Sequence, residues 1–464
     1  MIVQRADATA RQARAAARAR VDGGARFVWC YADRDEHGTF VRYVVDENGA
    51  LRSFDGYLQN ALESLGLPAA GWHERELVER WGVQLDAAPG EPSPLIPSAA
   101  EGYRHVDSPD ASTVLYGPVR SGIGESARWI IETRGEDFAH VTPSFGFKYR
   151  GLEARFAGVP LDQAPFVAEH VSGATAVSHA TAFARAAEAA LNVEVPPRAR
   201  AARAILSELE RIHQHLDALA KLADDGSLSV GAAHTYAAKE RVHRLLARAV
   251  ENRFGRGVVC VGGTRFDAFE ALHAACRTDL ELVEHETLAA LEALFATPSL
   301  IDRLVGTGHL DAATIGAFGA VGPVARGSGV PCDARTRDGW NFTSQEADEA
   351  LAAGGDALAR AQVRREEIHR SFLLVRNALD AAPPGPSCAA VPSFGAAEGM
   401  ARVESPQGEL LYAVRFDGQL RRVAIRSASF QNWPLFVPAL PGNIFTDFSF
   451  IEHSFGLIVA ETDR

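Results

Sequence analysis

The sequence predicts an α+β fold, with a small N-terminal α/β domain over residues 1–100 and a mostly helical domain over residues 101–464. The helical domain is expected to carry short β-sheets at its start and at its end. Three observations predict this arrangement. Strand-forming residues dominate the beginning of the chain, a Pro/Gly-rich segment at 89–97 follows, and apolar residues then recur at helical spacing through most of 164–380.

The composition is that of an ordinary globular protein, with 47% hydrophobic and 23% charged residues. A formal net charge of −12 argues against general nucleic-acid binding, which normally requires a basic face. No apolar run approaches the roughly 18 residues of a membrane span.

The chain contains five cysteines, and no two of them have a metal-ligand spacing such as C-x-x-C. They are Cys30, Cys260, Cys276, Cys332 and Cys388. We therefore expect buried free thiols in a reducing cytosol, and neither a disulfide nor a cysteine–metal site.

The first elements are expected to be strands. Residues 27–31 and 39–45 are rich in β-branched and aromatic residues, and a turn-forming segment separates them. Residues 57–65 read as a helix. The Arg/Ala-rich segment 5–26 is interpreted as a solvated helix or a frayed tail. The alternative, an organellar transit peptide, is disfavoured because the segment lacks serine.

The second domain opens with a predicted hairpin or small sheet over 116–132. The strongest helical signal lies at 200–222, where five apolar residues form one stripe at steps of three and four. These residues are Ile205, Leu209, Ile212, Leu216 and Leu219. Glu208 and Arg211 stand at i,i+3 on this helix and are expected to pair.

Further elements follow the same criteria. Helices are predicted at 232–254 and 346–379, the second with a kink at Gly354-Gly355. A Pro-rich loop is predicted at 381–393, and alternating residues within 400–427 predict a β-hairpin.

One short motif resembles a known family. Arg150-Gly151-Leu152-Glu153 is followed by fifteen residues and then by Glu169. This frame resembles the first signature of nickel–iron hydrogenase large subunits, in which two cysteines come next. Those positions hold Ser172 and Thr175. The same family includes the large quinone-site subunit of respiratory complex I, which also lacks these cysteines.

The end of the chain continues the resemblance. Membrane-bound hydrogenases carry two further cysteines before a similar Thr-Asp-Arg, and counting back from Arg464 places them at Ile458 and Glu461. A nickel–iron centre needs soft thiolates, whereas hydroxyls are hard ligands and isoleucine has no ligand atom. The resemblance therefore implies no nickel, no hydrogen turnover, and no metal or other cofactor bound by this chain itself.

A further family-like segment at 322–335 contains Arg326, Asp333 and Arg335. In the hydrogenases a corresponding Arg-rich loop lines the active-site cavity. Two interpretations stay open here: the three residues line a cavity, or they form a buried ion-pair network between helices.

The resemblance to complex I also suggests positions in a quinone cavity. A Gly-Pro-x-His loop of that subunit supplies a histidine near the quinone, but here Arg120 and Gly124 occupy the two histidine positions. Arginine keeps its proton at neutral pH and cannot serve as the donor. The quinone-binding tyrosine position corresponds to Phe183, and His179, one turn earlier, is the nearest imidazole. The alternative for His179 is an ordinary hydrogen-bonded helix residue.

An acidic residue that pairs with the quinone-site histidine of complex I corresponds to Asp225, within one residue. The alternative is a helix C-terminal turn. The candidates for a quinone cavity are therefore Arg120, His179, Phe183, Asp225, Arg326 and Asp333.

Residues 72–83 resemble the terminal motif of the small α/β subunit that sits beside the large subunit in complex I. In some bacterial enzymes, including membrane-bound formate hydrogenlyases, the two are fused in this order. We place the boundary near residue 100. The alternative is an unrelated small α/β domain.

The resemblance implies the large subunit of a complex I-like or hydrogenase-related electron-transfer complex, whose cavity delivers electrons to a quinone or another acceptor. Its implied partners are a small iron–sulfur subunit, a membrane-embedded subunit and a ferredoxin-like subunit. Its implied place is cytoplasmic, peripheral on the inner face of the plasma membrane. In the family NADH is handled by another subunit, and Gly122-Ile123-Gly124 lacks the third glycine of a nicotinamide-binding motif. The alternatives are a non-catalytic structural or coupling subunit and, least favoured, an active membrane-bound hydrogenase.

Overall fold

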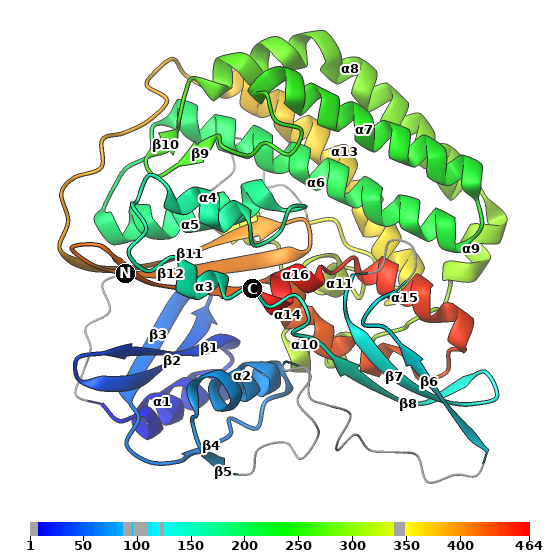
Figure 1. Cartoon of the computed structure of the whole chain (residues 1–464). Coiled ribbons are helices and arrows are strands. Elements are labelled where there is room, and N and C mark those ends of the chain that lie inside the picture. Colours follow the sequence, from blue (N-terminus) through cyan, green and yellow to red (C-terminus); the bar gives the residue numbers. More distant parts are fainter. Residues whose placement is uncertain (1–7, 87–94, 96–109, 121–124, 338–348) are drawn as a thin grey trace.

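A computed structural model of the chain describes residues 8–86, 95, 110–120, 125–337 and 349–464. A β-rich N-terminal unit lies at one end of the molecule, long helices lie at the other, and the C-terminal strands lie between them (Figure 1). The fold is thus α+β, as the sequence predicts.

The N-terminal unit is an antiparallel sheet in the order β1-β2-β3, with two helices beside it. Its elements are α1 (Ala10–Asp22), β1 (Arg26–Asp35), β2 (Gly38–Glu47), β3 (Ala50–Tyr57), β4 (Leu62–Glu63), α2 (Gly71–Trp81) and β5 (Leu85–Asp86). The predicted strands are confirmed. The segment expected to be a solvated helix or frayed tail is α1, which packs through buried Ala10, Ala13 and Ala17.

The helix predicted at 57–65 is wrong. Tyr57 ends β3, and Leu62–Glu63 form β4, which pairs in parallel with β5. Glu74 of α2 accepts hydrogen bonds from the Ser64 hydroxyl at 2.6 Å and from the Leu65 amide at 2.5 Å. These contacts from the following helix hold the segment extended, so tertiary structure overrides its local helical preference.

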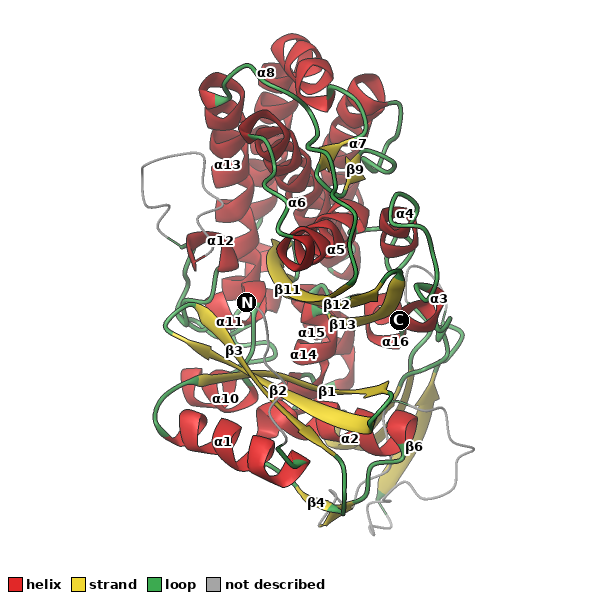
Figure 2. Ribbon diagram, turned by 90° about the vertical axis from the view of Figure 1, so that its left-hand side faces the viewer, coloured by secondary structure: helices red, strands yellow, loops and turns green. Residues whose placement is uncertain are grey.

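A second antiparallel sheet faces the first. It consists of β11 (Ala396–Ser405), β12 (Gly408–Asp417) and β13 (Leu420–Arg426), which confirms the predicted hairpin. Figure 2 shows the two sheets lying one above the other. Their apolar contact includes Val28, Trp29, Tyr31, Val44, Leu411, Ala413 and Ala424. The N-terminal sheet is therefore buried on both faces, which explains its nearly continuous apolar strands.

The helical part is built around the long helix α6 (Pro197–Asp225), which contains the predicted helix 200–222. Its neighbours are α5 (Ala176–Leu191), α7 (Ser229–Val250), α8 (Ala268–Phe295) and α13 (Ala357–Ala381). The helix predicted at 232–254 is confirmed as α7. Helix α5 packs on β11 and β12, so it joins the helices to the C-terminal sheet.

The kink predicted at Gly354-Gly355 is wrong, because α13 starts only after both glycines. Asp356 is the N-cap, and its side chain accepts a hydrogen bond from the Ala359 amide at 2.8 Å. Gly355 has φ +70°, and a Cβ there would lie 2.3 Å from the Leu310 carbonyl oxygen. The glycines make a tight turn into the helix.

The remaining elements are short. They are β6 (Ala111–Tyr116), β7 (Arg128–Arg134), β8 (Asp137–Ser144), α3 (Leu152–Arg155), α4 (Ala164–Glu169), β9 (Val259–Cys260), β10 (Gly263–Thr264), α9 (Pro298–Leu304), α10 (Ala312–Phe318), α11 (Gly322–Arg326), α12 (Ala334–Arg337), α14 (Ala428–Asn432), α15 (Phe448–Phe455) and α16 (Val459–Asp463). Strands β6, β7 and β8 form the small sheet predicted at the start of the helical domain.

Several sequence interpretations lie outside the described residues. These are the boundary near residue 100, the segment 121–124 with Gly124, and all of the linker 89–97 except Leu95. Within the described part of the chain, no helix is long and apolar enough to span a membrane.

Candidate functional site

The buried carboxylate of Glu461 joins the two ends of the family-like frame. The Thr175 hydroxyl donates to Glu461 Oε1 at 2.5 Å, and the Ser429 hydroxyl donates to Oε2 at 2.8 Å. The Ile458 amide donates to Ser429 Oγ at 3.0 Å. Three of the four positions matched to metal-binding cysteines are thus linked in one hydrogen-bonded cluster.

Ser172, the fourth position, lies on the neighbouring segment. The guanidinium of Arg150 donates to the Val171 carbonyl at 2.7 Å and to the Ala460 carbonyl at 3.2 Å. This side chain therefore holds the segment before α5 against the C-terminal segment. The Ser172 hydroxyl itself is buried and accepts from the Ala174 amide at 3.3 Å.

The donor atoms at these positions do not match a nickel–iron centre. They supply two hydroxyls, one carboxylate and one hydrocarbon side chain, whereas such a centre requires soft thiolate ligands. In the described ranges, no group of three or more His, Cys, Asp or Glu side chains is arranged to hold a metal ion.

His179 and Phe183 both lie on α5 and are fully buried. His179 Nδ1 is 2.8 Å from the Tyr412 hydroxyl, and Nε2 is 3.4 Å from Glu461 Oε1. Burial holds the pKa of Tyr412 well above its ordinary value, so a protonated hydroxyl lies beside Nδ1. Phe183 stacks on Phe156 with ring centroids 5.4 Å apart. The imidazole therefore faces the Glu461 cluster, and Phe183 belongs to the apolar core.

A cavity of about 280 Å³ lies beside this cluster, at the end of α6. Its walls include Arg120, Glu125, Ala174, Gln214, Asp217, Lys221, Gln407, Trp433, Glu452, His453 and Ile458. Arg120 lies in the wall, where its Nη1 is 2.8 Å from Glu452 Oε2. Ile458 connects the cavity to the Glu461 cluster.

His453 of α15 lines this cavity and was not a candidate from the sequence. Its Nδ1 lies 2.6 Å from Oδ2 of Asp225, the last residue of α6. Both side chains are largely buried, at 15% and 13% exposure. Asp225 thus ends the helix and also has a histidine partner, but no motif near His453 marked that residue.

Arg326 and Asp333 lie elsewhere, in a buried charged network beside α6. Arg326 contacts Glu404 at 2.8 Å and Glu367 at 2.6 Å. Asp333 contacts Arg335 at 2.6 Å. Neither Arg326 nor Asp333 lines the 280 Å³ cavity.

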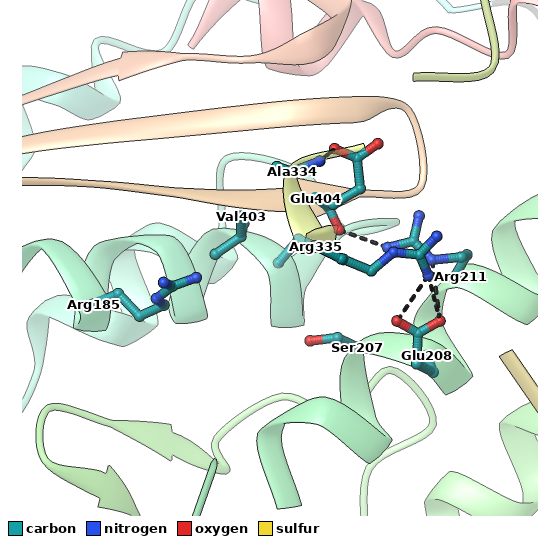
Figure 3. Close-up of a pocket in the computed structure, with 9 residues that line it drawn as sticks. Arg185, Ser207, Glu208, Arg211, Ala334, Arg335, Val403 and Glu404 are labelled. Carbon is teal, nitrogen blue, oxygen red and sulfur yellow. Dashed lines mark hydrogen bonds and ion pairs between the residues drawn. The ribbon is translucent and has the colours of Figure 1, made fainter. Parts of the chain in front are cut away.

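Figure 3 shows part of this network, where Arg211 and Arg335 converge on Glu208. The Glu208–Arg211 pair predicted from the sequence is present at 3.2 Å. The hollow among these residues measures only about 10 Å³, enough for about one water molecule. These contacts tie the 326–335 loop to the helices.

Glu153 of the first motif also has a structural role. It accepts from Arg422 at 2.9 Å, from Arg464 at 3.0 Å and from the Ile425 amide at 2.9 Å. Burial opposes ionisation, but the two arginines lower the pKa of Glu153 to about 2. This carboxylate anchors the C-terminal residue beside the site.

Comparison with known proteins identifies relatives. A family model described as respiratory-chain NADH dehydrogenase, 49 Kd subunit, matches residues 224–398 and 390–464. The chain is 31% identical to membrane-bound hydrogenase subunit alpha of Pyrococcus furiosus, over 76% of this chain and 87% of the relative. It is 29% identical to an NADH-quinone oxidoreductase subunit of Anaeromyxobacter dehalogenans, over 78% and 98%. It is 27% identical to formate hydrogenlyase subunit 5 of Escherichia coli, over 86% and 76%.

Proposed function

The chain belongs to the family of the respiratory-chain NADH dehydrogenase 49 kDa subunit, and we propose that it is the large subunit of a membrane-associated electron-transfer complex. The names of its relatives support this proposal, because they are subunits of NADH-quinone oxidoreductases and of membrane-bound hydrogenases. The chemistry that the cavity supports decides whether the complex functions like an NADH-quinone oxidoreductase or like a membrane-bound hydrogenase.

We propose that the 280 Å³ cavity receives the head group of a quinone. The observation that carries this proposal is His453 in the cavity wall, whose Nδ1 lies 2.6 Å from Oδ2 of Asp225 behind it. Quinone reduction needs two electrons and two protons. An imidazole can donate a proton to a quinone oxygen. A carboxylate that contacts its other ring nitrogen fixes the orientation of the imidazole. Arg120 lies in the same wall as an ion pair with Glu452.

We propose that this chain holds no nickel–iron centre. The electrons for the quinone would therefore come from an iron–sulfur cluster in a partner subunit. The donor set at Ser172, Thr175, Ile458 and Glu461 supports that proposal, because Thr175 already donates to Glu461 and the Ile458 amide is linked to Glu461 through Ser429. Metal analysis of the purified chain should find no stoichiometric nickel. One nickel per chain would contradict the assignment.

We further propose that residues 1–100 correspond to the small α/β subunit of complex I, fused ahead of the large subunit. The match to formate hydrogenlyase subunit 5 supports this, because it extends over 86% of the chain, against 76% for the Pyrococcus subunit. The expected partners are a small iron–sulfur subunit, a membrane-embedded subunit and a ferredoxin-like subunit. The chain would sit at the cytoplasmic face of the membrane, and NADH would bind elsewhere in the complex.

The test is to tag this chain in its native host and purify it from membranes. We expect an iron–sulfur subunit and a membrane subunit to co-purify, and the complex to reduce a short-chain quinone. Isolation of the chain with neither subunit would overturn the assignment.

The second candidate is a coupling subunit without redox chemistry of its own. It is favoured by the ion pair that already occupies Arg120 and by the burial of Phe183 in the apolar core. Variants of His453 separate the two candidates. Loss of quinone turnover in an assembled complex supports a quinone site in this chain, and unchanged turnover supports the coupling role.

A further inference from the structure

Two cysteines that are distant in sequence meet at the surface of the helical domain. The sulfur atoms of Cys260 and Cys388 lie 3.7 Å apart, although 128 residues separate them. Cys260 ends strand β9, and Cys388 lies in the loop between α13 and β11. Their spacing in the sequence gave no indication of this contact.

The backbone holds this contact in place. Cys388 forms an isolated bridge with Gly263, the residue that pairs with Cys260 in the β9–β10 hairpin. On either side of Cys388, the Ala389 amide donates to the Gly262 carbonyl at 2.9 Å, and the Thr264 amide donates to the Ser387 carbonyl at 2.8 Å. The loop around Cys388 is thus hydrogen-bonded along the hairpin.

Glycine is required for this close approach. A Cβ at Gly263 would lie 2.2 Å from the Ser387 carbonyl oxygen, and a Cβ at Gly262 would lie 2.6 Å from the Ala389 carbonyl oxygen. Gly262 also has φ +92°, which favours glycine. The Gly262-Gly263 pair lets the cysteine-bearing loop lie directly against the hairpin.

Both thiols are accessible from an open cavity of about 560 Å³. The cavity is also lined by Leu161, Thr264, Arg265, Val391 and Phe394. Cys388 is exposed and Cys260 is half-buried, whereas Cys30, Cys276 and Cys332 are buried. The expectation that all five thiols are buried is therefore wrong for this pair, because their loop and hairpin lie at the surface.

We propose that Cys260 and Cys388 form an oxidisable dithiol site whose reaction partner is a small disulfide of the glutathione type. The Cys388 thiolate attacks the small disulfide, forms a mixed disulfide and releases one small thiolate. Cys260 sulfur then attacks Cys388 sulfur, forms the Cys260–Cys388 bond and releases the second small thiolate. The two protein thiols lose two electrons and two protons, and the small disulfide becomes two thiols.

The environments of the two sulfurs set their order of reaction. Burial raises the pKa of Cys260 to about 12, so this thiol is protonated at neutral pH. Exposed Cys388 meets the small disulfide first, and Cys260 resolves the mixed disulfide, passing its proton to the departing thiolate. Bond formation brings the sulfurs from 3.7 Å to about 2.05 Å and ties the 382–395 loop to the β9–β10 hairpin.

The test treats the reduced full-length chain with oxidised glutathione, blocks free thiols by alkylation and examines the products by mass spectrometry. We expect loss of two hydrogens from the intact mass, a peptide linking Cys260 to Cys388, and no retained glutathione. Excess dithiothreitol should restore both thiols.

Three variants make the test specific. Cys260→Ser should trap glutathione on Cys388, Cys388→Ser should remain unmodified at Cys260, and Cys276→Ser, which alters a buried thiol, should behave like the parent. A parent chain that keeps a stable glutathione on Cys388 while Cys260 stays alkylatable would overturn the proposal. So would a parent chain in which both cysteines stay fully alkylatable over a range of glutathione ratios.

Discussion

Nδ1 of His453 lies 2.6 Å from Oδ2 of Asp225, and 228 residues separate the two in sequence. The pair joins the last residue of α6 to α15, and its histidine lines the 280 Å³ cavity. We expect Arg120 to occupy the position of a loop histidine that lies near the quinone in complex I. The structure thus contains a carboxylate–imidazole pair, and its imidazole comes from α15 and not from the loop that contains Arg120.

Replacement of His453 tests whether this pair supplies protons. In the assembled complex, we expect His453→Gln to lower quinone reductase turnover by about 100-fold, in the range by which a positioned acid accelerates a reaction. Asp225→Asn should also lower turnover, because it weakens the orientation of the imidazole. The matched control is His285→Gln on the exposed face of α8. Equal turnover in His453→Gln and the control would rule out this role.

The Glu461 cluster is expected to stabilise the fold. Glu461→Ala removes the acceptor of the buried Thr175 and Ser429 hydroxyls. Leaving buried polar groups unpaired costs about 1–3 kcal/mol each, so the free energy of unfolding should fall by at least that amount. Chemical denaturation of the purified chain measures the change. Glu461→Gln should recover part of it, and Glu281→Ala, on the exposed face of α8, should change stability by less than about 0.5 kcal/mol.

Stability is expected to fall in mild acid. Burial lowers the pKa of His73 to about 3 and that of His215 to about 4, below their ordinary 6.5. Between the lowered and ordinary values the unfolded chain binds more protons than the folded chain, so the unfolding free energy falls as pH drops from about 6.5 to about 4. Each such histidine contributes a slope of at most about 1.4 kcal/mol per pH unit.

Denaturation midpoints measured from pH 7 to pH 4 test this expectation. His73→Gln should reduce the slope of the unfolding free energy against pH, because it removes a group that binds a proton in the unfolded chain and not in the folded chain. His285→Gln, which alters an exposed histidine, should leave the slope unchanged. A His73→Gln chain with the parental slope would show that His73 is not kept neutral by burial.

The contact between the two sheets depends on Glu409. This buried carboxylate lies 2.8 Å from Arg26 of the N-terminal unit and 3.0 Å from Arg426 of β13. Glu409→Ala would leave the buried guanidinium of Arg426 without its contacting counter-charge, whereas Arg26 would keep Asp46 at 3.2 Å. Leaving a buried charge uncompensated typically costs about 3–5 kcal/mol. Denaturation should report this loss. The exposed Asp417–Arg421 pair provides the control, and Asp417→Ala should cost less than about 1 kcal/mol.

The sequence predicted the parts of the fold whose signals are local. The apolar stripe of 200–222 and the alternation in 400–427 each reflect the face that the element buries, and both elements are present. The segment 57–65 could not be predicted in this way, because Glu74 of another helix determines its conformation. The glycines before α13 were likewise ambiguous until their backbone conformation was known.

The candidate site was predicted only where a motif marked it. Counting along the family frame placed Thr175, Ile458 and Glu461 at matching positions, and the structure joins them through hydrogen bonds. His453 and the Cys260–Cys388 contact depend on long-range packing. Two residues 228 or 128 positions apart leave no periodic signal in a single sequence.

Photoaffinity labelling with an azido-quinone in the intact membrane complex tests the central claim most directly. We predict that the label attaches to peptides containing Arg120 or residues 452–459, and that excess unlabelled quinone prevents it. Label confined to other subunits, in a complex that still reduces quinone, would contradict a quinone cavity in this chain.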